Sequence, residues 1–516
     1  MNGKSIFSNN LNAHGLNYWI RLACLAFSLT ILPAHAETPV TDPIATDVAT
    51  DPNVVDPNAA VNGGAVTLDA FGVPIPAAPV VAAPPAPEPV VEAVVEEPPP
   101  PPATEPFLVG FDKISAGDTA WMLTSTALVL LMTIPGLVLF YAGMVRKKNV
   151  LSTALQSFAV CCLVSVIWVV VGYSLAFTPG STPWIGSFDR VMLSGLSYLK
   201  ETSELSVSHL AQSIPESVFI MFQMTFAIIT PALIVGAFAE RMKFTAMLVF
   251  MSFWTILVYA PVAHWVWEPS GLLASRGVLD FAGGTVVHIN AGAAGLMCAY
   301  MLGPRAGYNK VPFIPYNLMY TLVGASLLWV GWFGFNAGSA VAADGRAGMA
   351  MLVTQIAAAM GALTWIGIEY FVKSRITMLG FASGAVGGLV AITPASGFVN
   401  VSGALAIGFA AGLMCYWGAT SLKRLLGADD ALDVFGIHGV GGLVGAVLTG
   451  VFVDKAIGGV DGSVWLQAAA AFGTLFYSAI VTLILLVIIN KTIGLRVDAE
   501  QEHDGLDLTQ HAERVS

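Results

Sequence analysis

Charged residues are scarce in this 516-residue sequence: Asp, Glu, Lys and Arg make up 11% of it, against 56% hydrophobic residues. Soluble globular proteins carry roughly 25% charged residues, so the shortage excludes an ordinary soluble protein and indicates a membrane protein. The formal net charge of −11 says nothing about a substrate, because eleven acidic residues and no Lys or Arg lie between Glu37 and Glu105. The remaining 22 acidic residues (33 minus 11) balance the 22 basic ones, and no nucleic acid is expected as a partner.

Cysteine is also rare, and the sequence has no C-x-x-C or other metal-ligand spacing. The five thiols lie in apolar runs, where we expect small packing residues: Cys24, Cys161, Cys162, Cys298 and Cys415. Neither a metal nor any other cofactor is expected. A nucleophile, base and orienting group in a recognisable arrangement are missing as well, so the sequence does not predict an enzyme.

The N-terminal region has the pattern of a secreted leader followed by a low-complexity extension. Residues 1–36 combine basic Lys4 and Arg21, a short apolar stretch and an Ala34-His35-Ala36 cleavage site, which is typical of a signal peptide. Residues 37–107 are rich in Pro, Ala and acidic residues. Such a composition buries too little apolar surface to fold, so we expect a disordered periplasmic spacer.

Beyond this extension, residues 108–490 form a series of apolar runs long enough to span a bilayer, which requires about 20 residues. We predict an all-α polytopic membrane protein with 11 transmembrane helices, of which the eighth is the shortest. The expected spans are 120–142, 151–177, 214–239, 244–263, 283–302, 314–334, 347–372, 377–393, 401–422, 434–453 and 464–489.

Basic residues predict the orientation of these spans. Fourteen Lys and Arg residues follow odd-numbered spans, beginning with Arg146, whereas six lie on the opposite side of the mature chain. The positive-inside rule makes the first side cytoplasmic. We therefore expect a multi-pass protein of the inner (cytoplasmic) membrane, with a periplasmic N-terminus and a cytoplasmic tail at residues 491–516.

Two histidines lie at similar depths in two of the predicted spans, His288 in the fifth and His438 in the tenth. An odd span count fits two inverted five-helix repeats plus one peripheral helix, and such folds place their site between the halves. The fragments Leu279-Asp280 and Leu432-Asp433 lie upstream of the two histidines and weakly support the repeat. Facing neutral imidazoles can share one hydrogen bond and point their other nitrogens along a pore, which suits a small proton-exchanging solute.

Carboxylates and aromatic residues flank these spans. Asp280 and Asp433 are expected to cap the helices that carry the two histidines, and Asp280 could also attract a cation. Trp267 ends the fourth span, and Phe222 and Phe226 share one face of the third. These rings fit either an interfacial aromatic belt or a cation-binding cage, and the pattern alone leaves both readings open.

Several long motifs resemble the ammonium transporter (Amt) family in its bacterial form, over about Asp118 to Gly505. They include Phe140-Tyr141-Ala142-Gly143, Gly236-Ala237-Phe238-Ala239-Glu240-Arg241, Leu279-Asp280-Phe281-Ala282-Gly283-Gly284-Thr285-Val286-Val287-His288-Ile289-Asn290, Gly331-Trp332-Phe333-Gly334-Phe335-Asn336-Ala337-Gly338-Ser339 and Asp433-Val434-Phe435-Gly436-Ile437-His438-Gly439. The sequence departs from the family at Glu268-Pro269-Ser270, where small Gly-rich sequence is usual.

The resemblance implies ammonium or ammonia transport, with methylammonium as an analogue, through a homotrimer in which each protomer holds its own pore. It implies an outer site that recruits ammonium with Trp267, Phe226 and Ser339. The roles it implies in gating and conduction fall on Phe335, Phe222, Trp332, His288, His438 and Asp280.

Two short tail motifs, Gly494-Leu495-Arg496-Val497 and Gly505-Leu506-Asp507, resemble the cytoplasmic segment through which family members are regulated. In bacterial members the regulator is a PII-type protein, so such a partner is expected here. Two alternatives to transport stay open. One is an ammonium sensor, and the other is a neutral gas channel of the related Rh type.

Overall fold

The computed structural model describes residue 72 and residues 103–515. The chain divides into two units, Met1–Pro101 and Pro102–Ser516, and the description below concerns the second. The predicted signal peptide lies outside the described residues. So does the predicted extension at 37–107, except for Gly72 and residues 103–107.

Ten helical segments of the described part are long and apolar enough to cross a membrane. Helices suit this environment because every backbone N–H and C=O inside the segment finds a partner within it. The segments are Ala116–Met144 (α2, η2, α3), Lys147–Phe177 (η3, α4, η4, α5), Glu216–Phe238 (α6), Phe244–Trp267 (α7, η6, α8), Gly284–Leu302 (η8, α9), Leu318–Gly338 (α10), Gly345–Lys373 (α11), Val401–Leu426 (α13, η9, α14), Phe435–Phe452 (η10, α15) and Val464–Thr492 (α17).

The predicted eighth span is shorter than the hydrocarbon core of a membrane. Helix α12 (Met378–Ile392) has 15 residues, or about 22 Å at 1.5 Å per residue, less than the roughly 30 Å of a hydrocarbon core. The chain continues through buried turns at Thr393–Phe398 before α13 (Val401–Trp417) begins. By length and composition, ten helices of the described chain are long enough to cross a membrane, and α12, the predicted eighth span, is a shorter apolar helix.

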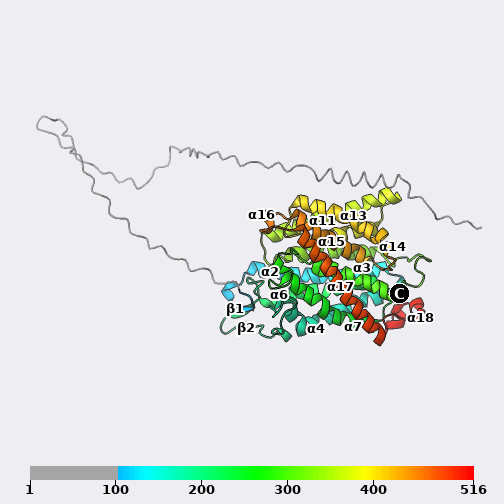
Figure 1. Ribbon diagram of the computed structural model, residues 1–516, viewed down its shortest axis with the longest axis horizontal. Coiled ribbons are helices and arrows are strands. Elements are labelled where there is room, and N and C mark those ends of the chain that lie inside the picture. The colour runs from blue at the N-terminus through cyan, green and yellow to red at the C-terminus, as the bar shows by residue number, and fades with distance from the viewer. Residues whose placement is uncertain (1–71, 73–102, 516) are drawn as a thin grey trace, which may run out of the picture. The chain divides into compact units, whose positions relative to one another are not determined.

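The helices form two sets with matching contacts. In the first set α2 (Ala116–Leu131) packs on α6, and α6 packs on α9 (Asn290–Leu302). In the second set α10 packs on α12, and α12 packs on α15 (Val440–Phe452). The first, third and fifth helices of each set thus have equivalent neighbours, as two repeats require, and α17 packs against α9 and α15 from outside (Figure 1).

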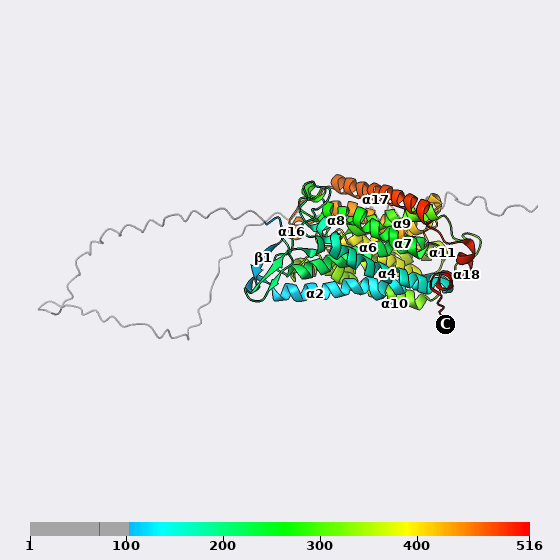
Figure 2. The ribbon, with the colours of Figure 1, turned by 90° about the horizontal axis from the view of Figure 1, so that it is seen from below.

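A small antiparallel sheet that the sequence did not predict lies at the end of the bundle where α2 begins (Figure 2). Its strands are β1 (Phe107–Gly110), β2 (Tyr198–Leu199) and β3 (Glu204–Val207), in the order β1-β3-β2. Phe107 pairs with Val207, and Tyr198 pairs with Leu205. The strands are two to four residues long, too short for their alternation to stand out in a sequence dominated by apolar helices.

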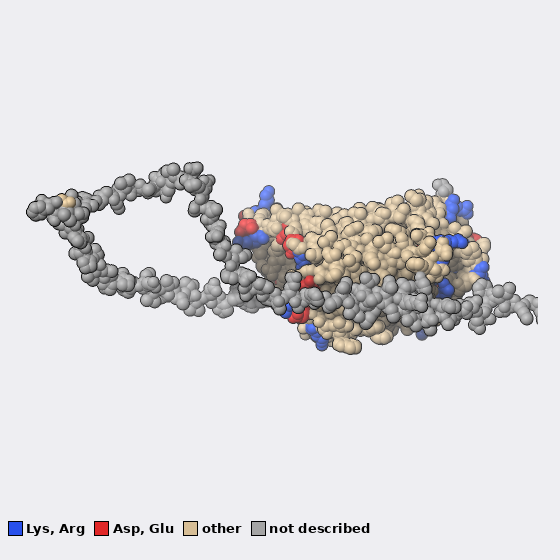
Figure 3. All heavy atoms as spheres, turned by 90° about the horizontal axis from the view of Figure 1, so that it is seen from above, with Lys and Arg blue, Asp and Glu red and all other residues tan. Residues whose placement is uncertain are grey.

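Charged side chains gather at the two ends of the bundle, and the visible face between them has almost none (Figure 3). The chain's C-terminal tail packs against one of these ends through α18 (Ala499–Asp504) and α19 (Leu506–His511). Asp507 accepts hydrogen bonds from the backbone N–H groups of Leu151 and Ser152, at 3.1 and 2.8 Å. These two groups begin α4 (Val150–Ile167), where a carboxylate complements the unpaired backbone donors.

Close backbone contact between the two repeats depends on glycine. A Cβ atom on Gly292 of α9 would overlap the backbone N and Cα of Gly439, which immediately precedes α15. Lipid offers no hydrophobic driving force between helices, so association there depends on small residues that allow close packing. Gly292 lies one turn after His288, and Gly439 directly follows His438, so this contact sets the distance between the two histidines.

We expect Gly292→Ala to lower the melting midpoint of the purified protein in detergent, because the added methyl group pushes two backbones apart. Overpacking of this kind costs about 1–3 kcal/mol. Gly473→Ala is the matched control, since Gly473 lies in α17 with no atom within 4 Å of an added Cβ. The intrinsic helix preference for alanine favours both variants equally. A Gly292→Ala protein that melts at the wild-type midpoint would contradict this account of the packing.

Candidate functional site

The two histidines meet at the contact between the repeats. His438 Nδ1 lies 3.3 Å from His288 Nδ1, and the ring centroids are 5.3 Å apart with an interplanar angle of 30°. One ring must donate and the other accept, so the two imidazoles adopt different tautomers when both are neutral. Both side chains are buried. His288 Nε2 has no hydrogen-bond partner among the described residues, so this polar atom is available to a solute.

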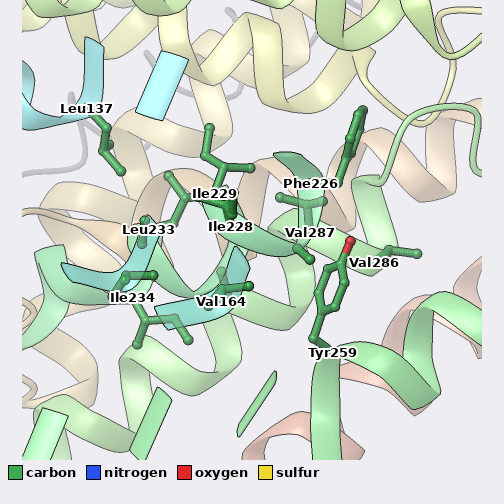
Figure 4. Close-up of a cluster of buried hydrophobic side chains, with 14 of the residues drawn as sticks. Leu137, Val164, Phe226, Ile228, Ile229, Leu233, Ile234, Tyr259, Val286 and Val287 are labelled. Atoms are coloured by element: carbon green, nitrogen blue, oxygen red, sulfur yellow. The ribbon is translucent and has the colours of Figure 1, made fainter. Parts of the chain in front are cut away.

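An apolar passage surrounds the pair. It contains a cavity of only about 10 Å³, roughly the space of one water-sized probe. Its lining is aliphatic and aromatic apart from the two imidazoles: Met132, Leu137, Phe140, Ile229, Leu233, Val287, His288, Leu328, Trp332, Phe335, Val386 and His438. Figure 4 shows four of these lining residues among the buried side chains: Leu137, Ile229, Leu233 and, from η8 (Gly284–Ile289), Val287. A hydrated ion does not fit such a space.

Two stacked phenylalanines separate this passage from a wider cavity. The rings of Phe226 and Phe335 lie 4.2 Å apart with an interplanar angle of 27°. Phe335 lines the narrow passage, whereas Phe226 lines a second cavity of about 190 Å³. A solute that moves from one cavity to the other must displace this pair.

The wider cavity is framed by aromatic residues. The ring of Trp267 lies edge-on to Phe226 at 5.7 Å and is stacked on Phe177 at 6.4 Å. Ser339 Oγ donates to the carbonyl oxygen of Phe335 at 2.8 Å. Its lone pairs are therefore free to accept a hydrogen bond from the N–H group of a cation. The full lining is Phe177, Leu210, Phe219, Gln223, Phe226, Trp267, Phe281, Ser339 and Val341.

Of the other two predicted gate residues, Trp332 lines the narrow passage and Phe222 does not. Trp332 lines the narrow passage 5.4 Å from the His288 ring and donates through Nε1 to Thr393 Oγ1 at 2.9 Å. Phe222 packs against Phe226 at 4.9 Å but lines neither cavity. Phe222 can thus support the ring of Phe226 from behind without meeting the solute in this conformation.

Asp280 caps the helix that carries His288. Its carboxylate accepts four backbone hydrogen bonds, from Gly283, Gly284, Thr285 and Val286, at 2.6–3.2 Å. Its backbone carbonyl accepts a hydrogen bond from Trp267 Nε1 at 3.0 Å. Burial raises the pKa of this carboxyl, and the four hydrogen bonds oppose the shift. Asp280 lines neither cavity, so its geometry is that of a residue that positions Trp267 and η8.

The predicted capping role of Asp433 is wrong. Asp433 pairs instead with Lys423 at 2.8 Å, and Asp430 accepts the hydrogen bond from the backbone N–H of Phe435 at 2.7 Å. Asp280 precedes His288 by eight residues, and Asp430 precedes His438 by eight. Positions in the two repeats therefore correspond at an offset of 150 residues (430 minus 280). The predicted match of Leu279-Asp280 with Leu432-Asp433 was three residues out of register.

Sequence reasoning also missed several members of the outer cavity. Phe219, Gln223 and Phe226 are spaced four and three residues apart and share one face of α6, a pattern that could have identified the first two. The unusual Glu268 does not enter the cavity. Its carboxylate lies 3.0 Å from His209 Nε2, and both side chains are buried.

No group of three or more His, Cys, Asp or Glu side chains that could hold a metal ion occurs among the described residues. Of the five cysteines, Cys24 lies outside the described part. The other four are free, and Cys162 alone among them is exposed.

Asp430 predicts a pH dependence of stability. Burial raises the pKa of its carboxyl to about 6, above the value of about 3.9 expected in the unfolded chain. A raised pKa in the folded state means a stabilising contribution that is complete below about pH 4 and lost as the pH rises through 6, worth about 3 kcal/mol. The fall in melting midpoint between pH 4 and 8 should therefore be smaller in Asp430→Asn than in the wild type. The exposed Asp461→Asn serves as control, and equal pH dependence in all three proteins would refute the shift.

Comparison with known proteins agrees with this arrangement. A model of the Ammonium Transporter Family matches residues 120–515. An ammonium transporter of Bacillus subtilis is 47% identical over 408 residues, which cover 77% of this chain and 98% of that protein. The crystal structure of Saccharomyces cerevisiae Mep2 matches with a TM-score of 0.70 at 36% identity, covering 75% of this chain and 89% of that one. A solved sensor Amt protein matches with a TM-score of 0.70 at 27% identity, covering 77% and 98%.

The matching family and the Bacillus subtilis relative are ammonium transporters, which confirms the expectation that the chain is not an enzyme. The helical architecture and the long spans agree with the same assignment. The chain is a multi-pass membrane protein that belongs to the Ammonium Transporter Family.

Proposed function

We propose that this protein transports ammonium across the cytoplasmic membrane, binding NH4+ in the outer aromatic cavity and passing it as NH3 through the narrow passage. The observation that carries the proposal is the hydrogen-bonded pair His288–His438 inside an otherwise apolar passage. A small solute that can donate and accept hydrogen bonds finds polar partners there, and a hydrated ion finds too little space.

The outer cavity supports the first step. The faces of Trp267 and Phe226 attract a cation by about 0.5–2 kcal/mol, depending on how far it is desolvated. Ser339 Oγ offers lone pairs, because its proton is engaged by the carbonyl of Phe335. The cavity has no Lys or Arg in its lining. This combination favours a small cation with N–H groups over a neutral gas, and so favours ammonium transport over an Rh-type channel.

The constriction supports the second step. Burying an unpaired charge in an apolar space costs many kcal/mol, whereas a small neutral molecule avoids that cost. Ammonium can release a proton before the Phe226–Phe335 pair and cross as ammonia; potassium, although similar in size and charge, has no proton to release. The chemistry of the solute, rather than the diameter of the passage, would then set the selectivity.

A sensor is the second candidate, and it is favoured by the likeness to the solved sensor Amt protein. A sensor binds ammonium in the outer cavity but passes little of it. Transport is the better proposal because His288 Nε2 in the passage beyond the phenylalanines is left without a protein partner.

We further propose a homotrimer in the inner membrane, with the docked tail on the cytoplasmic side. That side carries the larger number of basic residues, as the positive-inside rule requires. A PII-type protein is the proposed partner of the tail surface. Retention of such a protein by the immobilised full-length chain at low ATP and 2-oxoglutarate concentrations tests this partnership.

The direct test of the transport proposal is methylammonium uptake by the His288→Ala variant in a strain without other ammonium transporters. Uptake should fall to the background of the empty strain, because the variant removes both the shared hydrogen bond and the free Nε2. His503→Ala is the matched control, since its side chain is 87% exposed on α18. Wild-type uptake by a His288→Ala protein present at wild-type levels in the membrane would overturn the assignment.

A further inference from the structure

A buried pair of ionisable side chains lies beside the outer cavity and takes no part in the proposed transport path. His209 Nε2 lies 3.0 Å from Glu268 Oε2, and the two side chains are 2% and 3% exposed. A carboxylate oxygen only accepts, so the imidazole donates through Nε2. Its Nδ1 has no hydrogen-bond partner among the described residues. The contact with Glu268 is therefore what fixes the ring of His209.

Glu268 lies at the corner where α8 (Ala260–Trp267) ends. Its φ of −85° and ψ of 127° are extended, which is the conformation that a residue before proline prefers, and Pro269 follows it. Gly271 then donates its backbone N–H to the carbonyl oxygen of Glu268 at 2.8 Å. The helix therefore ends one residue before Glu268, and the carboxylate reaches His209.

His209 belongs to the turn that follows strand β3. Ala211 donates its backbone N–H to the carbonyl oxygen of Ser208 at 3.0 Å, and Leu210 donates to Ser208 Oγ at 3.2 Å. These two bonds close the turn on itself. The bond from His209 to Glu268 connects the turn to the end of α8, across 59 positions of the sequence.

Both of the connected segments contribute a wall of the outer cavity. Leu210 follows His209, Trp267 precedes Glu268, and Leu210 and Trp267 both line the cavity, whereas neither member of the pair does. The indole of Trp267 is also held through Nε1 by the carbonyl oxygen of Asp280 at 3.0 Å. The pair therefore acts on the cavity through the backbone, by fixing the position of Leu210 relative to Trp267.

Loss of the contact would disturb this arrangement. A buried polar group without its partner loses more free energy than the hydrogen bond contributed, because water does not reach it. Either side chain left alone would shift toward solvent, and the turn or helix end that carries it would shift as well. A cation held by ring faces is sensitive to such a shift, since the attraction requires it to lie within about 6 Å of the ring centroid.

We propose that Glu268 and His209 are a positioning pair that sets the affinity of the outer cavity for ammonium by holding Trp267 and Leu210 in place. This inference rests on the function proposed for that cavity. The effect depends on the reach and the hydrogen bond of Glu268 rather than on its negative charge. Its carboxylate is directed to His209 and Ser270, at 3.0 and 3.3 Å, and does not line the cavity.

Two substitutions separate the reach of Glu268 from its charge. Glu268→Gln keeps the length and an accepting oxygen but removes the charge, whereas Glu268→Asp keeps the charge and is shorter by one C–C bond, about 1.5 Å. The affinity is measured as the dependence of the melting midpoint of the full-length protein in detergent on ammonium chloride, with sodium chloride at the same ionic strength as reference.

We expect the Gln variant to bind ammonium within about twofold of the wild type. The Asp variant should bind it about fivefold more weakly, which is the size of one ordinary hydrogen bond. Glu201→Asp is the matched control, because Glu201 is exposed in the turn between β2 and β3. This control should bind ammonium as the wild type does.

Methylammonium uptake by the same variants gives a second readout. A positioning role predicts that KM rises about fivefold in Glu268→Asp while the maximal rate stays near that of the wild type, because the passage beyond the phenylalanines is unchanged. His209→Ala should raise KM as well. The double variant should be no worse than His209→Ala alone, because the effects of two partners in one contact are not additive.

Either of two results would rule the proposal out. One is wild-type ammonium affinity in Glu268→Asp, which would mean that the reach of the side chain has no influence on the cavity. The other is equal weakening in Glu268→Gln and Glu268→Asp, which would show that the charge itself attracts the cation. A wild type that binds ammonium but takes up no methylammonium would instead contradict the transport proposal and leave the comparison of affinities intact.

Discussion

The contact of Gly292 with Gly439 is the constraint on which the arrangement of the pore depends. Any larger side chain at Gly292 would separate the two repeats, and the 3.3 Å distance between His288 and His438 would be lost. The helices that meet there are positioned from their ends by Asp280 and Asp430, each eight residues before its histidine. One close backbone contact and two capping carboxylates thus hold a polar pair inside an apolar passage.

In the proposed mechanism the same construction combines an ammonium site in the outer cavity with a passage too narrow for a hydrated ion. The outer cavity is wide enough for an ammonium ion and offers ring faces and a hydroxyl oxygen. Beyond the stacked Phe226 and Phe335, the passage narrows to the space of about one water molecule. Asp280 connects the two regions, because its carbonyl positions Trp267 and its carboxylate caps the helix of His288. A substitution at Asp280 should therefore disturb both the outer cavity and the narrow passage.

Much of this could be predicted from the sequence, because the apolar spans and the two buried histidines differ clearly from their surroundings. The placement of His288 beside His438 followed from their similar depth in two spans. The predictions that failed concern details that depend on how the chain folds around a residue. Asp433 looked like the capping residue, but the cap is Asp430, because the turn between them bends the chain and leaves Asp433 to pair with Lys423.

Other misses have similar causes. The sequence predicted helix α12 as the shortest span, but it did not predict the buried turns through which the chain leaves that helix. Strand β1 is held by pairing with β3, about 100 residues later in the chain, which a local pattern does not reveal. Gln223 joins the outer cavity only because α6 turns that face toward Trp267.

The central claim is that the passage selects a solute able to release a proton. Recording on proteoliposomes that contain the purified protein, with imposed gradients of ammonium and then of potassium at equal concentration, tests it most directly. The account predicts a change of internal pH or a current with ammonium that is absent from protein-free liposomes, and no response to potassium. A potassium response comparable to the ammonium response would contradict it.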